Sequence, residues 1–67
     1  MSLRLDVPAV HRRMAELHLT QNGVAERMGI SPQALSVALS RGTFSHINVF
    51  RLAEALGMRY EDVYKEV

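Results

Sequence analysis

Residues 20–42 constrain the fold of this chain most, because they carry the start and stop signals of two short helices joined by a tight turn. Thr20 offers a hydroxyl that can accept a hydrogen bond from a free N–H group in the first turn of a helix. Apolar side chains then recur at helical spacing and predict a buried stripe of Val24, Ala25 and Met28. Gly29 follows, where a glycine can adopt the left-handed conformation that ends a helix. A helix is therefore expected over residues 21–28.

The second helix of the pair has a start signal of its own. Ser31 is a hydroxyl N-cap candidate, and Pro32 follows at the first helical position, where its missing N–H group does no harm. A second buried stripe, formed by Leu35, Ala38 and Leu39, predicts a helix over about residues 32–40. The apolar Ile30 lies in the turn, where it can fill the angle between the two helices. The whole stretch predicts a helix-turn-helix.

Residues 21–40 resemble the helix-turn-helix of the phage repressor and Cro (XRE-type) family of DNA-binding domains. The positions that carry the resemblance are Gln21, Ala25, Gly29, Ile30, Ser31, Leu35 and Ser36. The similarity extends over about residues 7–65, because residues 19–21 resemble the family's lead-in, residues 52–57 its fourth helix and residues 60–64 its short fifth helix. The resemblance implies a compact five-helix bundle of the λ-repressor-like type. It also implies a small transcriptional regulator, a repressor by expectation, that binds double-stranded DNA.

The remaining residues predict three more helices and no strand, so the expected class is all-α. Residues 1–6 are expected to form a disordered or extended arm, and residues 7–67 a single helix-turn-helix domain. The first helix begins after a cap at Asp6 or Val7, the fourth covers about residues 46–56 after the N-cap Ser45, and the fifth covers about residues 60–66. The buried stripes expected in these helices are Val7, Val10, Met14 and Leu17, then Val49, Leu52, Ala53 and Leu56, then Val63.

Charge is distributed unevenly along the chain, although the formal net charge is only +1. Residues 1–51 hold six arginines and three acidic residues, a net of +3, whereas residues 52–67 hold two basic and four acidic residues, a net of −2. Such an asymmetry suits a protein with one face toward phosphate, and random scatter is the alternative. The chain has no cysteine, which excludes disulfides and thiolate metal sites. A cytoplasmic protein is expected, since no apolar run is long enough to span a membrane.

The exposed face of the second motif helix provides the candidate base contacts, which are Pro32, Gln33, Ser36, Val37 and Ser40. The Gln33 amide can pair with adenine in a bidentate fashion, which is worth about 1–3 kcal/mol of discrimination between bases. Ser36 lies one turn further and can bond a base edge or a phosphate, while Val37 can pack on a thymine methyl group. Each of these could also be an ordinary solvated side chain, and the surrounding motif is what favours DNA contact.

The candidate phosphate contacts flank that helix. By the resemblance, Gln21 and the N-terminus of its helix hold a backbone phosphate through free N–H groups and the positive end of the helix dipole. The other candidates lie at helix starts or after the reading helix and are Asn22, Arg41, Thr43 and Ser45. Residues 29–42 are one residue longer than the family's common spacing, which leaves the register of Ser40 and Arg41 open. No lysine or arginine precedes Arg41 in the helix, which argues against guanine readout.

Apolar or amphipathic residues remain on the fourth and fifth helices, through which the family commonly dimerises. They are Ile47, Phe50, Tyr60, Tyr64 and Val67, and they form a homodimer interface or complete the core. The alternative function is an antitoxin or adaptor module whose main contact is another protein, such as a toxin. No enzyme, metal site or cofactor is expected, because the three histidines have no carboxylate at ligand spacing.

Overall fold

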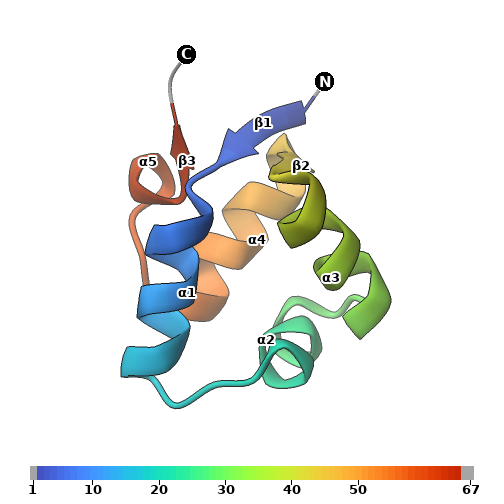
Figure 1. Cartoon of the computed structure of the whole chain (residues 1–67), viewed down its shortest axis with the longest axis vertical. Coiled ribbons are helices and arrows are strands. Elements are labelled where there is room, and N and C mark those ends of the chain that lie inside the picture. Colours follow the sequence, from blue (N-terminus) through green and yellow to red (C-terminus); the bar gives the residue numbers. More distant parts are fainter. Residues whose placement is uncertain (1, 66–67) are drawn as a thin grey trace.

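The computed structural model describes residues 2–65, which form helices arranged around α4 and a small sheet at one end (Figure 1). The elements in chain order are β1 (Ser2–Leu5), α1 (Val7–Glu16), α2 (Gln21–Met28), α3 (Pro32–Arg41), β2 (Thr43–Ser45), α4 (His46–Leu56), α5 (Tyr60–Val63) and β3 (Tyr64–Lys65). In Figure 1, α1 and α3 lie on opposite sides of α4, and α2 lies at the end of the molecule away from the sheet.

Side-chain caps begin four of the helices, as the sequence predicts. Each cap oxygen accepts a hydrogen bond from the N–H group three residues later: Asp6 from Ala9 (3.3 Å), Thr20 from Gly23 (3.1 Å), Ser31 from Ala34 (3.1 Å) and Ser45 from Asn48 (3.4 Å). A cap of this kind contributes about 1 kcal/mol to stability. The expected bounds of α2 and α4 are confirmed residue for residue.

The core lies between α4 and the elements around it. The largest fully buried side chains are Leu35, Leu52, Leu56, Val10, Val24, Val49 and Val63, all of them members of the predicted stripes. Full burial of such a side chain contributes about 1.5–3 kcal/mol. Because α4 alone supplies three of the seven, it is the element against which the others pack.

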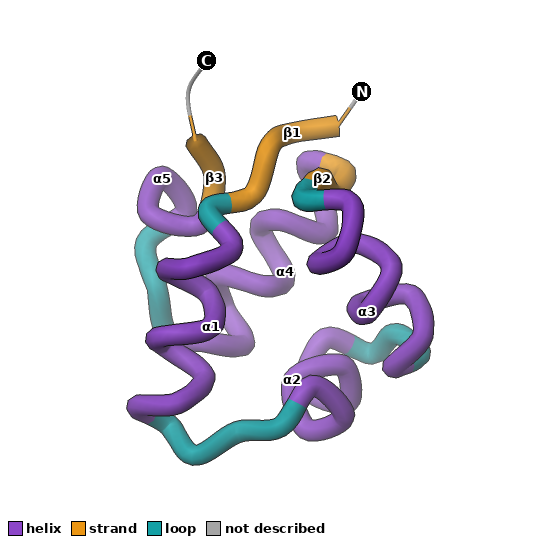
Figure 2. Tube along the Cα trace, viewed as in Figure 1, coloured by secondary structure: helices purple, strands orange, loops and turns teal. Residues whose placement is uncertain are grey.

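A three-stranded antiparallel sheet makes the expectation of an all-α chain incomplete, although the mostly helical bundle is confirmed (Figure 2). The strand order is β2-β1-β3, with Leu3 opposite Phe44 and Leu5 opposite Tyr64. The N-terminal segment is thus an extended central strand. Residues 2–5 do alternate between polar and apolar side chains, but four residues are too few for period two to compete with the helical signals around them.

The fifth helix is shorter than expected, because the chain leaves it to join the sheet. It covers Tyr60–Val63 and not residues 60–66. The N–H group of Asp6 donates to the carbonyl oxygen of Val63 at 2.8 Å, and Tyr64 then adopts the extended conformation and pairs with β1. Pairing with a strand almost sixty residues earlier therefore overrides the local helical preference of residues 64 and 65.

Candidate nucleic-acid interface

The turn between α2 and α3 is fixed by its backbone hydrogen bonds and by the residues packed behind it. Gly29 takes φ of 73°, and its N–H group donates to the carbonyl oxygen of Glu26 at 3.1 Å. The N–H group of Ile30 reaches back to the carbonyl oxygen of Ala25 at 3.0 Å, which is the bonding pattern of a Schellman motif. Ala25 and Leu35 are both completely buried where the two helices meet. These hydrogen bonds and buried contacts together set the orientation of α3 relative to α2.

One face of α3 is buried and the opposite face is open to solvent. Leu35, Ala38 and Leu39 point into the core. All of the predicted base-contact residues are exposed, namely Pro32, Gln33, Ser36, Val37 and Ser40. Val37 is 49% exposed, which is high for a valine. Ala34 is exposed on the same face and was missed from the sequence, where its size gave no signal.

The last turn of α3 contains the two residues whose register the sequence leaves open. The helix continues to Arg41, one residue further than expected, and Gly42 ends it with φ of 74°. Ser40 and Arg41 consequently lie in the last turn of α3, both exposed.

The predicted phosphate candidates gather at two places. Gln21 and Asn22 are exposed at the N-terminus of α2, where the first N–H groups of a helix have no partner within it. Arg41 and Thr43 lie together at the other end of α3, where a depression of about 280 Å³ opens between α3, β2 and α4. It is lined by Ser2, Ala34, Val37, Ala38, Arg41, Thr43, Phe44, Ser45 and Asn48.

Two of the lining residues, Ser2 and Asn48, were missed from the sequence. The pairing of β1 with β2, in which Ser2 lies opposite Ser45, brings Ser2 to this place. Asn48 follows the cap of α4 by three residues, and that offset was the only available signal. Ser45 is half-buried and its hydroxyl caps α4, so capping is its observed role.

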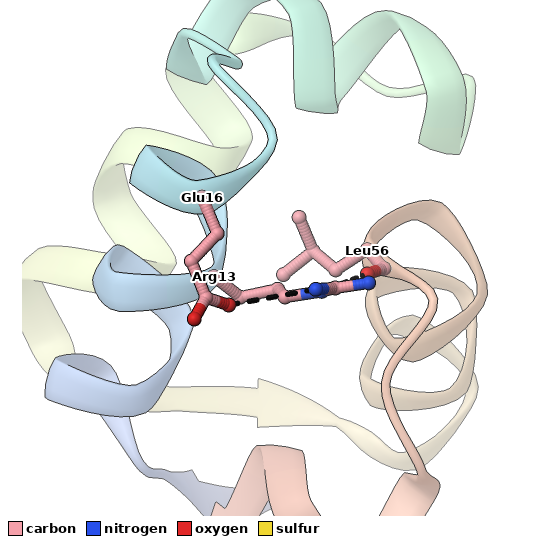
Figure 3. Close-up of polar contacts among 3 residues, drawn as sticks. All are labelled: Arg13, Glu16 and Leu56. Carbon is pink, nitrogen blue, oxygen red and sulfur yellow. Dashed lines mark hydrogen bonds and ion pairs between the residues drawn. The ribbon is translucent and has the colours of Figure 1, made fainter.

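Arg13 and Arg27 are engaged with the end of α4 instead of this region. The Nε atom of Arg13 donates to the Leu56 carbonyl oxygen at 2.8 Å, and its Nη1 atom lies 3.4 Å from a Glu16 carboxylate oxygen (Figure 3). Arg27 donates from Nη1 to the Ala55 carbonyl oxygen at 3.1 Å. Both positive charges therefore stabilise the C-terminus of α4, where carbonyl groups lack helical partners.

The residues predicted for a homodimer interface form an aromatic row with an exposed isoleucine nearby. Phe50 and Tyr60 have ring centroids 6.4 Å apart, and Tyr60 and Tyr64 are 5.0 Å apart. Tyr60 and Tyr64 are half-buried against the core, whereas Ile47 and Phe50 remain 60% and 50% exposed. Completing the core therefore accounts for the tyrosines and not for Ile47 or Phe50. Val67 lies outside the described residues.

Residues 2–65 contain no cluster of three potential metal ligands. The same part of the chain has no helix long and apolar enough to cross a membrane.

Comparison with known proteins agrees with the geometry of α2 and α3. A family model described as helix-turn-helix matches residues 10–63, which is most of the chain, and confirms the resemblance to the phage repressor and Cro family. No curated protein and no solved structure shows significant similarity to the chain. The matched range begins within α1 and ends with α5, so β1 and β3 lie outside it.

Proposed function

The chain belongs to the helix-turn-helix family of DNA-binding domains, and we propose that it is a cytoplasmic transcriptional regulator, a repressor, that binds double-stranded DNA through α3. The observation that carries the proposal is the outer face of α3. Its polar side chains are exposed, and within residues 2–65 Gln33, Ser36 and Ser40 engage in no side-chain hydrogen bond. An α-helix with its side chains is about 10–12 Å across, and the major groove of B-DNA is about 12 Å wide.

Gln33 is the principal base-reading residue of the proposal. It stands in the first turn of α3, where recognition helices contact base edges, and its amide matches the donor and acceptor pattern of adenine. Val37 lies one turn further along the same exposed face and offers methyl groups to thymine. The face is completed by Pro32, Ser36 and Ser40. Because α3 has no lysine or arginine before Arg41, the proposed reading helix prefers A·T pairs over G·C pairs.

Phosphate contacts on both sides of the groove would hold α3 in register. Gln21 and Asn22, at the positive end of the α2 dipole, bind one backbone segment. Arg41 and Thr43 bind another segment beyond the end of α3. Ser45 caps α4 next to them, so the N-terminus of α4 is a further phosphate contact there. These contacts give affinity without sequence preference.

We also propose that the regulator acts as a homodimer. The extents of one chain are 29 × 21 × 18 Å, less than the roughly 34–36 Å that separates two half-sites on one face of DNA. Two chains are therefore needed to occupy both half-sites. Ile47 and Phe50 supply the exposed apolar surface for the contact, flanked by Tyr60 and Tyr64. The same surface also favours the second candidate, an antitoxin or adaptor whose partner is another protein such as a toxin. The two functions do not exclude each other.

The chain offers a matched test, because Gln21 and Gln33 are its only glutamines. A duplex would first be selected from a randomised pool by the wild-type protein and then titrated at several salt concentrations. Gln33→Ala should lose about 1–3 kcal/mol of discrimination at one base-pair position, whereas Gln21→Ala should weaken binding equally on all sequences. If the folded wild-type protein prefers no duplex over random DNA even at low salt, the regulator proposal is wrong.

A further inference from the structure

The sheet presents a polar outer face on the side away from the core. Leu5 and Phe44 are buried, so the residues that alternate with them point outward. Arg4 pairs with Thr43 on one side and with Lys65 on the other, and all three side chains are exposed. Residues directly opposite each other in a sheet share a face, so Thr43, Arg4 and Lys65 form one row across the three strands.

This row brings two positive charges together without an acidic partner among the described residues. Arg4 and Lys65 take part in no ion pair within residues 2–65. Three acidic residues near the row in sequence are engaged elsewhere: Asp6 caps α1, while Glu61 and Asp62 each lie 3.5 Å from Arg59. Glu66 lies outside the described residues. Like charges directly opposite each other destabilise a sheet. The arrangement therefore serves an external anion better than it serves the fold.

The row also continues the surface proposed for phosphate at the end of α3. Thr43 belongs both to the row and to the depression that Arg41 lines, and Ser2 of β1 lines the same depression. In Figure 1, β2 lies at the C-terminal end of α3, and β1 extends from beside β2 toward β3. Neighbouring strands are about 4.8 Å apart, so the row spans roughly 10 Å. One DNA strand advances about 3.4 Å per nucleotide along the helix axis, so the row corresponds to the axial rise of about three nucleotides.

We propose that the outer face of the sheet is a second phosphate-binding surface, in which Arg4 and Lys65 contact the backbone of the same duplex beyond the end of α3. The inference rests on the proposed function, since it needs α3 in the groove to bring the backbone to the sheet. It goes beyond the helix-turn-helix itself, because β1 and β3 lie outside the residues that match the family. The continuity with Arg41 and Thr43 favours DNA backbone over an acidic protein as the occupant.

The test is the salt dependence of binding by the double variant Arg4→Gln/Lys65→Gln, measured by fluorescence anisotropy on the selected duplex and on a duplex of random sequence. Each lost phosphate contact lowers the slope of log K against log [salt] by about 0.9, so the double variant should lose about 1.8. At 0.1 M salt this corresponds to binding up to about 60-fold weaker. The loss should be the same on both duplexes, and the helical circular dichroism should be unchanged because both side chains are exposed.

The matched control is Arg12→Gln, an exposed arginine on α1, which lies on the opposite side of α4 from α3 (Figure 1). It removes a positive charge without touching the row, and its slope should equal that of the wild type. A double variant that binds DNA with the wild-type slope would overturn the inference and leave the proposed function standing. If Arg12→Gln lowers the slope by as much per removed charge as the double variant does, the inference is also overturned, because net charge alone would then explain the loss. Absence of any wild-type binding would overturn both proposals.

Discussion

Replacing Arg13 by methionine tests whether an arginine on α1 holds the C-terminus of α4. The Nε atom of Arg13 lies 2.8 Å from the Leu56 carbonyl oxygen, across 43 residues of chain. A Cβ atom at residue 57 would come 3.3 Å from the Arg13 Nη2 atom, so Gly57 leaves room for the guanidinium. Methionine keeps an unbranched stem of similar width and removes the donor and the charge.

The expected loss is about 1.5–2 kcal/mol of unfolding free energy. A hydrogen bond to a charged group contributes about 1.5–3 kcal/mol, and the lower end applies because 35% of the Arg13 side chain is exposed. The ion pair with Glu16, at 3.4 Å and on the surface, adds at most about 0.5 kcal/mol. For a domain of this size each kcal/mol corresponds to about 4–8 °C, so Tm should fall by roughly 6–16 °C.

Urea unfolding followed by circular dichroism measures the difference, with Arg12→Met as the control. Arg12 is the exposed neighbour on the same helix, and its replacement should change the free energy of unfolding by less than about 0.5 kcal/mol. Arg13→Lys should fall between, because lysine keeps the charge and loses the planar donor geometry. If Arg13→Met is no more destabilising than Arg12→Met, the bond to Leu56 does not stabilise the fold and the reasoning is refuted.

Four further variants have expected outcomes. Gly23→Ala should stabilise the protein by about 0.5–1 kcal/mol, since the new Cβ would meet neighbouring side chains at ordinary distances of 3.5 and 3.6 Å. Gly29→Ala should cost about 1–2 kcal/mol, because residue 29 has φ of 73°. In thermal unfolding, Tm should rise for the first variant and fall for the second. Leu35→Ala should cost about 2–5 kcal/mol and shift the urea midpoint down, because Leu35 is fully buried beneath the turn. In sedimentation equilibrium the wild-type protein should be a dimer, and Phe50→Lys should be a monomer with the fold retained. A Phe50→Lys variant that keeps the mass of the wild-type dimer would place the dimer contact elsewhere.

The helices could be predicted because their signals are local. Thr20, Ser31 and Ser45 each act within three residues of themselves, and a buried stripe repeats within one element. Once Leu35, Ala38 and Leu39 are assigned to the core, helical geometry fixes which side chains of α3 are exposed. The face of α3 proposed to read bases is therefore predictable from the sequence, whereas its contact with DNA stays a prediction.

The sheet could not be predicted, because its evidence is distributed over the whole chain. β2 and β3 have three and two residues, too few to show any period, and each becomes a strand only when β1 lies beside it. The cost of closing the chain between Arg4 and Lys65 is met by backbone pairing and by burial of Leu5 and Phe44. No short stretch of sequence contains both the residues that pair and the length of chain that must be closed between them.

The fold decides which positive charges are neighbours on the surface. Six arginines lie within residues 1–51, but Arg13 and Arg27 donate to carbonyl groups at the C-terminal end of α4 and do not face the candidate interface. Lys65, from the acidic part, lies beside Arg4 at the other end of the molecule's sequence. The positive charges of the surface proposed for phosphate are thus Arg41 in the last turn of α3 and the Arg4–Lys65 pair in the sheet. A chain with a net charge of only +1 can therefore concentrate its attraction for phosphate at one place, because strand pairing and not sequence order decides which charges are neighbours.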